Sequence, residues 1–176
     1  IKFRDKNPAP LSLIIGLLIS EAMDSVSGQK INAELKWPND LLINKKKICG
    51  ILIESEMSAD EVELIVGIGI NYSLPKKESW WGEIGELADI LPREKLMNSI
   101  LQNIINYKEN GYKNWKDAWE KRCMHIGIEL KALSNNQKDT DIGIFIGINE
   151  EGKMLLQTER GLKIISSGEC SIKGIY

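Results

Sequence analysis

The sequence predicts an α+β protein in which helices pack with a sheet and a small β-barrel follows toward the C-terminus. Apolar residues recur at three- and four-residue spacing in residues 11–26 and again after Pro92, as in helices with a buried face. Residues 34–71 contain three apolar segments of strand composition. From about Met124 onward, short strand-like pieces alternate with turns. These observations together predict the fold class.

Near Met124 the sequence changes from long helical and strand segments to short strand-like pieces, and this change divides the chain into two expected domains. A chain of 176 residues is long enough for a moderate domain and a small one. We place the boundary near residues 123–126, between a domain of residues 1–124 and one of residues 125–176. The pieces expected to form the barrel are Ile126–Ala132, Asp141–Ile148, Met154–Thr158, Leu162–Ser166 and Glu169–Ile172.

Two longer helices and a short third one are expected in the first domain. The first covers residues 11–26 and stops near Gly28, since glycine favours helix ends. The second begins after Pro92 and ends at Asn110-Gly111, and the third ends near residue 122.

The strands expected in residues 34–71 are a hairpin and a third strand. The hairpin joins Glu34–Ile43 to Lys47–Glu56 through the polar turn Asn44-Lys45-Lys46. The third strand, Val62–Asn71, is nearly continuous in its apolar residues, which is typical of a central strand covered on both faces.

Composition and cysteine spacing narrow the functional classes. Hydrophobic residues make up 43% and charged residues 27%, as in a globular protein, and the net charge of -2 gives no overall reason to expect nucleic-acid contact. Cys49, Cys123 and Cys170 are odd in number and lack a C-x-x-C pair, so we expect a reducing, cytoplasmic location and no metal site. The apolar run Leu11–Ile19 is too short to span a membrane.

The hairpin carries an unusual set of polar residues beside its apolar strands. Lys36-Trp37-Pro38-Asn39-Asp40 is followed by Lys47, and Gly50 lies three residues further on. A glycine in a strand often marks the close approach of a ligand, and a lysine beside it stabilises negative charge on phosphate or carboxylate oxygens. The segment therefore indicates an anion site. A solvated turn followed by an edge-strand lysine is the alternative interpretation of the same residues.

A second polar pattern ends the third strand, in Gly67-Ile68-Gly69-Ile70-Asn71. It lacks the third glycine and the following helix of a dinucleotide-binding fingerprint. Gly67 and Gly69 share one face of the strand and leave a slot there, and Asn71 offers both a donor and an acceptor.

Together these motifs resemble the biotin–protein ligase family in residues, order and spacing, over Leu11 to Lys173. The matching motifs are Lys36–Leu41, Lys47-x-x-Gly50-Ile51-Leu52-x-Glu54 and Gly67-x-Gly69-Ile70-Asn71, with Gly147–Leu156 and Ser167–Lys173 similar to the family's SH3-like domain. The resemblance implies that residues 1–124 form an incomplete mixed sheet with helices, as in the catalytic domain of class II synthetases and lipoate ligases. It also implies that residues 125–176 form an SH3-like β-barrel.

The resemblance implies an ATP-dependent biotin–protein ligase. Such enzymes use ATP and Mg²⁺ to convert biotin to biotinyl-5′-adenylate and then biotinylate a lysine of the biotin carboxyl carrier domain of acetyl-CoA carboxylase. The implied catalytic residues are Lys47, against the biotin carboxylate and the adenylate phosphate, and Asp40, which receives the proton of the incoming lysine or orients its amine. The implied biotin-binding residues are Lys47, Gly50, Gly67 and Gly69. The implied ATP-binding residues are Lys36, Asn39, Asn71, Lys173 and one of Trp80 and Trp81, and no metal ligand is assigned.

Three further expectations concern assembly and residues outside the chemistry. Relatives form dimers through the edge of the catalytic sheet, so a homodimer is expected here. Cys49 is expected to be a small packing residue, because the chemistry needs no thiol nucleophile. His125, the single histidine, is expected to be structural.

Two elements of the family are absent from this sequence. They are the Gly-Arg-Gly-Arg-x-Gly-Arg loop that closes over biotin and the adenylate, and the Ser/Thr-rich element that contacts the ureido ring of biotin. In relatives both precede the strand that matches Ile1–Arg4, so we expect the chain to be the C-terminal portion of a ligase. We then expect weak biotin binding and no carrier biotinylation by the chain alone. We also expect exposed apolar surface that promotes association.

Two other functions remain open. A lipoate–protein ligase shares the fold and an Asn-Asp…Lys-x-x-Gly pattern, but Trp37-Pro38, Gly67–Asn71 and the C-terminal segment favour biotin. A degenerate, non-catalytic ligase that serves as a binding or dimerisation module is the second alternative, because the biotin loop is absent.

Overall fold

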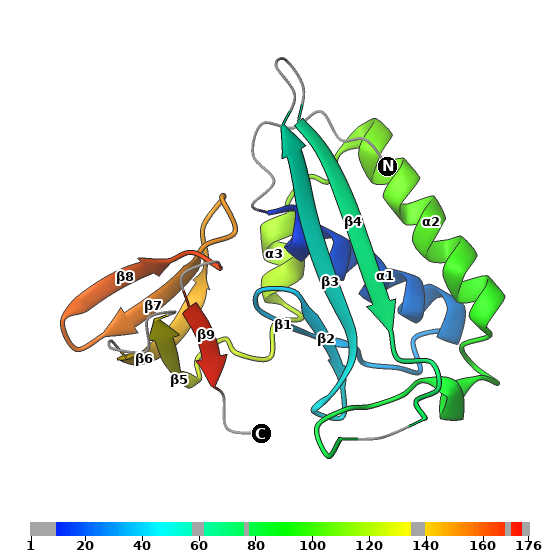
Figure 1. The fold of residues 1–176 in the computed structure, drawn as a ribbon, viewed down its shortest axis with the longest axis horizontal. Helices are drawn as coiled ribbons and strands as arrows, with labels where there is room; N and C mark the ends of the chain where they lie inside the picture. The colour runs from blue at the N-terminus through cyan, green and yellow to red at the C-terminus, as the bar shows by residue number, and fades with distance from the viewer. Residues whose placement is uncertain (1–9, 58–61, 76–77, 135–139, 168–169, 174–176) are drawn as a thin grey trace.

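The computed structural model of the protein describes residues 10–57, 62–75, 78–134, 140–167 and 170–173. A larger part with three α-helices and a four-stranded sheet lies beside a smaller five-stranded sheet (Figure 1). The α+β class is therefore confirmed. Among the described residues, no helix is both long enough and apolar enough to cross a lipid bilayer.

Helix α1 (Leu11–Ser27) forms the centre of the larger part. It ends at Gly28 as predicted, because Gly28 adopts a left-handed φ of 64° that glycine tolerates without strain. Most of its side chains are buried, since the sheet and the other helices surround it. At Gly16 the sheet comes close: a Cβ there would lie 3.5 Å from side-chain carbons of Ile51 and Leu35.

The four-stranded sheet has the order β1-β2-β3-β4, and all its paired strands are antiparallel. Its strands are β1 (Glu34–Lys36), β2 (Asp40–Ile43), β3 (Lys46–Met57) and β4 (Val62–Ile70). Among the described residues, parallel contacts are confined to two isolated bridges, Leu35 with Cys123 and Lys47 with Trp81. The expected mixed sheet is therefore antiparallel in all the pairings of its described strands.

Two of the predicted strands were wrong in detail. The expected single strand Glu34–Ile43 is two strands, β1 and β2, because the chain turns at Trp37-Pro38-Asn39, where proline cannot donate to a ladder. The expected central strand is β4, which lies at the edge of the described sheet. One face of β4 is open, and Ile65 on that face is 51% exposed.

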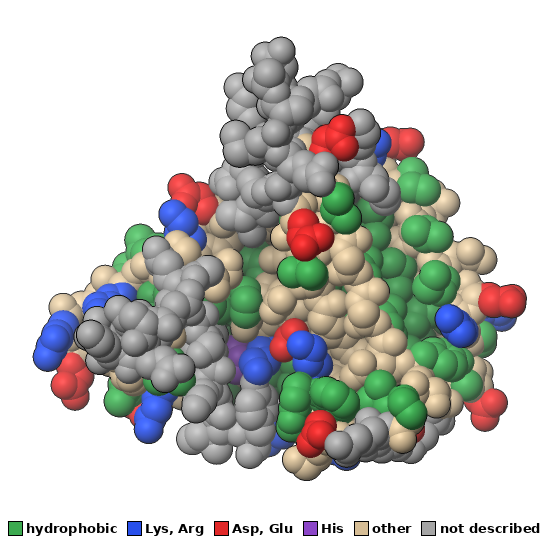
Figure 2. All heavy atoms as spheres, viewed as in Figure 1, with side chains coloured by type: hydrophobic (Ala, Val, Ile, Leu, Met, Phe, Trp, Pro, Cys, Tyr) green, Lys and Arg blue, Asp and Glu red, His purple; other side chains and the backbone are tan. Residues whose placement is uncertain are grey.

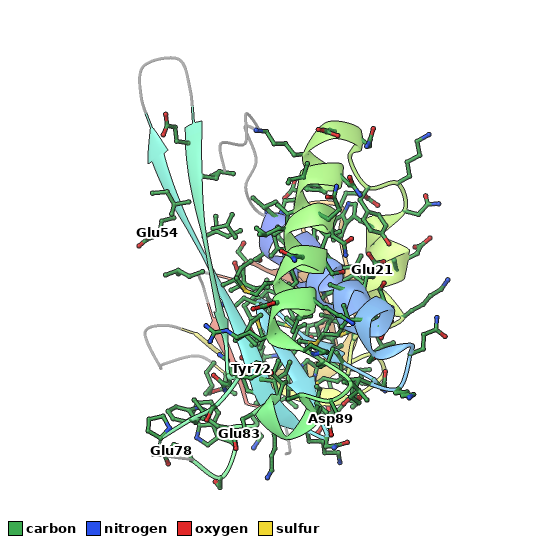
Figure 3. All side chains as sticks on the ribbon, turned by 90° about the vertical axis from the view of Figure 1, so that its right-hand side faces the viewer. Glu21, Glu54, Tyr72, Glu78, Glu83 and Asp89 are labelled. Carbon is green, nitrogen blue, oxygen red and sulfur yellow. The ribbon has the colours of Figure 1, made fainter. Side chains whose placement is uncertain are left out.

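Helices α1 and α2 (Arg93–Asn110) cover one face of the sheet, and no described helix covers the other face (Figure 3). Glu54 on β3 points away from the helices in that view. A 3₁₀ turn (Gly85–Leu87) precedes α2, and α3 (Trp115–Glu120) follows it. Helices α2 and α3 both lie in the regions where helices were predicted.

The apolar stripe of α2 is only half covered. Its buried members are Leu96, Ile100 and Ile104. Met97, Leu101 and Ile105 are 44–49% exposed, and Met97 and Leu101 border a groove of about 280 Å³ beside β4. Exposed apolar surface is therefore present, as expected, and association through it stays a prediction.

The C-terminal sheet is antiparallel, with the order β8-β7-β6-β5-β9. Its strands are β5 (Glu129–Ser134), β6 (Thr140–Ile148), β7 (Met154–Thr158), β8 (Gly161–Ile165) and β9 (Cys170–Lys173). The predicted strands are therefore present. Within the described residues β8 and β9 are the two unpaired edges, so the expected closed barrel is not seen.

We predict that the two faces of the helical layer differ sharply in their contribution to stability. Leu17 on α1 is fully buried, so Leu17→Ala is expected to lower the free energy of unfolding by about 3 kcal/mol through cavity formation. Leu101 on α2 is 48% exposed, so the same substitution there should change it by less than about 0.5 kcal/mol. Urea unfolding monitored by circular dichroism measures both values. Equal losses would contradict this description of the core.

Candidate functional site

The turn between β1 and β2 brings the predicted polar residues together. Lys36 and Asp40 are paired in register at the two ends of the turn, and the Trp37–Pro38 peptide is cis. Lys36 and Asp40 therefore lie on two neighbouring strands, β1 and β2. The turn instead places the Lys36 and Asp40 side chains next to each other.

The turn is attached to two neighbouring elements by hydrogen bonds. Ser12 on α1 donates from Oγ to the Pro38 carbonyl at 3.2 Å. Asn39 Nδ2 donates to the Ile51 carbonyl at 2.8 Å, and the Ile51 amide donates to the Asn39 carbonyl at 2.9 Å. The predicted ATP-binding residue Asn39 thus fixes the turn against β3.

A β-bulge in β3 decides where Lys47 points. The register between β2 and β3 shifts by one residue, so that Leu41 pairs with Cys49 but Leu42 pairs with Lys47. On a regular strand Lys47 and Gly50, three positions apart, would face opposite sides. With the extra residue they face the same side, since a Cβ on Gly50 would lie 3.2 Å from Lys47 Nζ.

Lys47 and Asp40 form the central ion pair of the site. The Lys47 Nζ atom lies 2.6 Å from Asp40 Oδ1, and the side chains are 32% and 16% exposed. The contact is an ion pair without hydrogen-bond alignment, because this Oδ1 atom has no partner of good hydrogen-bond geometry among the described residues. Figure 2 shows blue and red side chains side by side at the lower centre of this face.

The first hollow lies on the open face of β3 and β4 and measures about 450 Å³. Register places Gly50 opposite Gly69 and Leu52 opposite Gly67. The glycine floor (Gly50, Gly67 and Gly69) leaves backbone exposed where side chains would otherwise stand. The remaining lining residues are Asn39, Lys47, Ile51, Leu52 and Ile68.

The second hollow lies beside the first and measures about 290 Å³. Its lining residues are Lys36, Asp40, Leu42, Lys45, Lys47 and Trp80. Burial lowers the pKa of the Lys36 ammonium; Asp40 opposes this shift and Lys47 adds to it. Lys47 lines both hollows, so it stands where an uncharged, glycine-floored space meets a charged one.

Asn71 attaches the loop after β4 to the start of β3. Its Nδ2 donates to the carbonyls of Lys47 and Gly82, each at 3.1 Å. The Lys47 amide donates to the Trp80 carbonyl at 3.0 Å, and the Gly82 amide donates to the Lys47 carbonyl at 2.8 Å. The predicted ATP-binding residue Asn71 therefore positions the loop that carries the tryptophans.

Of the two candidate tryptophans, Trp80 lines the second hollow and is 52% exposed. Trp81 packs edge-on against it, with ring centroids 5.1 Å apart. Lys173 lies in β9 opposite Lys131, and its side chain lies outside the described residues. The structure thus brings together every predicted site residue except Lys173.

The sequence reasoning missed Lys45. It was regarded as a turn residue, but it lines the second hollow, because the β2–β3 hairpin curls beside Trp80. The sequence signal that could have indicated it is the position of Lys45 only two residues before Lys47. In the described part of the chain, no group of three or more His, Cys, Asp or Glu side chains could bind a metal ion.

Cys49 and His125 are buried beside the site. Burial, helped by Asp40, raises the pKa of the Cys49 thiol to about 12, so it stays protonated and is not a nucleophile. His125 is 2% exposed, and its Nε2 atom has no hydrogen-bond partner among the described residues. Burial, and to a lesser extent Lys36, lowers the pKa of His125 to about 4.

Residues 2–71 match the model of the Biotin/lipoate A/B protein ligase family, and residues 125–173 match the Biotin protein ligase C terminal domain. The chain is 31% identical over 175 residues to the Bifunctional ligase/repressor BirA of Bacillus spizizenii, with 92% of this chain and 52% of that protein covered. It therefore spans about half the length of that relative. A Biotin--[acetyl-CoA-carboxylase] ligase of Paracoccus denitrificans is 27% identical, with 94% of this chain and 74% of that protein covered.

Solved structures of the biotin protein ligase of Aquifex aeolicus are similar in fold. The apo structure has a TM-score of 0.74 and 32% identity, with 97% of this chain and 77% of that chain covered. The structure in complex with biotin and ATP has a TM-score of 0.73 and 31% identity, with 97% of this chain and 73% of that chain covered.

We predict that His125 makes the protein less stable in mild acid. The unfolded chain binds a proton at His125 below the ordinary pKa of 6.5, whereas the folded chain does so only near 4, so stability falls as the pH drops through this window. Relative to His125→Gln, the protein is expected to lose about 2 kcal/mol of unfolding free energy between pH 7.5 and pH 5. Urea unfolding at both pH values measures the difference. A difference that does not change with pH would contradict a buried neutral imidazole.

Proposed function

Because the chain belongs to the biotin protein ligase family, we propose that its site activates biotin with ATP and transfers the biotinyl group to a protein lysine. The single observation that carries this proposal is the place of Lys47, in the lining of both hollows. A reaction between a carboxylate and a phosphate requires a cation at the point where an uncharged binding space meets a charged one.

The first hollow suits biotin, and the second suits ATP. Exposed backbone on the glycine floor allows close contact with the uncharged ring system of biotin. Lys47 lies at the edge of this floor, where its ammonium can bind the biotin carboxylate. In the second hollow Lys36, Lys45 and Lys47 supply positive charge, and Trp80 supplies a face for stacking on the adenine. Asn39 and Asn71 act on this hollow by holding its walls, and Lys173 is the proposed contact from β9.

The first step forms biotinyl-5′-adenylate. A carboxylate oxygen of biotin attacks the α-phosphorus of ATP, the bond to the β-phosphate bridging oxygen breaks, and pyrophosphate leaves with Mg²⁺, which arrives as part of the substrate. The Lys47 ammonium has three donors, so it stays paired with Asp40 while it binds oxygens of the carboxylate and the α-phosphate. Lys36 adds positive charge where phosphate charge is greatest.

The second step transfers the biotinyl group. The amine of the carrier lysine attacks the acyl carbon, the bond to the phosphate oxygen breaks, and AMP leaves. Asp40, at 16% exposure, is the carboxylate that accepts the amine proton or aligns the amine. The proposed carrier is the biotin carboxyl carrier domain of acetyl-CoA carboxylase, as the name of the Paracoccus relative suggests.

The remaining proposals concern domains and setting. We assign residues 1–124 to the catalytic domain and residues 125–176 to an SH3-like C-terminal domain, supported by the second family match at residues 125–173. A cytoplasmic location and a homodimer complete the proposal.

Biotin-dependent exchange of pyrophosphate into ATP tests the proposed function. The assay is run with the 176-residue chain and with the product of the complete reading frame that encodes it, each with biotin and with lipoate. Exchange with biotin and the complete product is the expected result, with little or none from the 176-residue chain alone. Preference for lipoate would favour a lipoate ligase, and no exchange with either acid would favour a non-catalytic binding module.

We predict that Lys47→Ala slows biotin-dependent exchange by about 10²–10³-fold, because the cation at the reacting carboxylate and phosphate is lost. Lys45→Ala is the matched control, since Lys45 lines the same hollow at the turn but does not reach the first hollow. Lys45→Ala should slow the exchange by about tenfold or less. Equal losses in the two variants would place the reaction away from Lys47.

We predict that Gly69→Val blocks the first hollow without disturbing the fold. A Cβ at Gly69 meets only the Gly50 carbonyl, at 3.8 Å, so the valine side chain enters the hollow instead of clashing. In the complete gene product, the affinity for biotin should fall by at least about 100-fold, while the melting temperature stays within about 3 °C. Ile65→Val, on the same face but outside the lining, is the control. Unchanged calorimetric biotin affinity in Gly69→Val would show that biotin binds elsewhere.

A further inference from the structure

The turn that carries Lys36 and Asp40 is connected to the segment that follows α3 and to the C-terminal sheet. On one side of Lys36, the Leu35 amide donates to the Arg122 carbonyl at 2.8 Å, and the Leu35 carbonyl accepts from the Met124 amide at 3.0 Å. On the other side, Trp37 Nε1 donates to the Gly152 carbonyl at 3.0 Å. The backbone on one side of Lys36 is therefore fixed by the segment after α3, and the backbone on its other side by the C-terminal sheet.

The Gly152 carbonyl is presented by a turn that is closed by its own hydrogen bonds. The Asn149 amide donates to Lys153, the Gly152 amide donates to Asn149, and Asn149 Oδ1 accepts from the amides of Glu151 and Lys153. Gly152 itself is buried with a φ of 75°, and the Trp37 side chain is 1% exposed. Water cannot easily replace the indole as the donor to this carbonyl.

The C-terminal sheet is also fixed at α3 by an independent contact. Glu120 Oε1 accepts from the Ile148 amide at 2.9 Å. Gly147 makes room for this carboxylate, since a Cβ there would lie 2.6 Å from Oε1. The position of Gly152 relative to β1 is therefore set by more than Trp37.

The three residues of the turn are held by three different elements. Pro38 is bound by α1 and Asn39 by β3, so Trp37 connects the turn to the C-terminal sheet. The turn ends at the Lys36–Asp40 pair, and Asp40 contacts Lys47. A shift of the indole thus moves both charged groups beside Lys47.

We propose that Trp37 is a positioning residue. Its indole N–H, bound to the Gly152 carbonyl, couples the position of the C-terminal sheet to the positions of Lys36 and Asp40 during adenylate formation. Trp37 lines neither hollow, so it acts through these two residues. The reaction it serves is the proposed function given above, but the coupling itself rests on the contacts. Changes at Gly152, outside both hollows, therefore alter the rate of adenylation.

The first test compares Trp37→Phe with Trp119→Phe, because both tryptophans are 1% exposed and the two variants lose the same atoms. In ¹H–¹⁵N spectra, Trp37→Phe should shift the amide signals of Asp40, Lys47 and Gly50, and Trp119→Phe should leave them in place. In biotin-dependent pyrophosphate exchange by the complete gene product, Trp37→Phe should lower kcat by about tenfold, because charged groups are misplaced in the transition state. The KM for biotin should stay within about twofold, because the glycine floor lies on β3 and β4.

The second test approaches the same contact from the other side. Gly152→Ala is strained at a φ of 75°, so it should displace the carbonyl and lower kcat by about fivefold. If both substitutions act through one hydrogen bond, the double variant should be no slower than Trp37→Phe alone.

The outcomes separate the coupling from the reaction. Amide shifts confined to residues around Gly152, or rate losses that multiply in the double variant, would overturn the coupling. If the complete gene product shows no biotin-dependent exchange, the proposed function fails, and the spectra still decide whether Trp37 positions the turn.

Discussion

The ion pair between Lys47 and Asp40 depends on the extra residue that β3 carries opposite Leu41 and Leu42. Without this bulge, Lys47 would point to the helical face, where an ammonium could be buried only at a high cost. With it, the lysine lies on the open face above Gly50, whose missing side chain leaves room for the Lys47 side chain to reach Asp40. The bulge thus brings Lys47 to the face of the sheet where Gly50, Gly67 and Gly69 form the glycine floor.

Electrostatics and burial together give the site its chemical character. Lys36 and Lys47 both lie near Asp40, so the second hollow has more positive than negative charge. Partial burial strengthens these interactions, and it also opposes charge on Lys36, whose pKa is lowered. A phosphate would offset that effect of burial, because it would add negative charge beside Lys36 and Lys47. Cys49, protonated and buried beneath the pair, contributes packing and no charge.

The two parts of the chain form one packed unit. Their apolar cores are continuous, from Ile15 on α1 through Trp37 and Trp119 to Phe145 and Met154 in the C-terminal sheet. The polar contacts at the junction, Trp37 with Gly152 and Glu120 with Ile148, bridge more than twenty residues of sequence. Residues near 124 divide the chain by composition, but the charged turn belongs structurally to both sides of that division.

The sequence by itself determined the helices and the residue types of the site. Gly28, Pro92 and Gly111 mark helix ends through their own backbone preferences, so α1 and α2 were predicted closely. The lysines, glycines and amides of the two motifs were likewise recognisable, because their chemistry is local to each residue. Only the tertiary structure decided the turn at Trp37–Asn39, the bulge at Lys47, the edge position of β4, the open C-terminal sheet and the part played by Lys45. Each of these depends on which strands pair and in which register, and those pairings are set by packing between segments far apart in the chain.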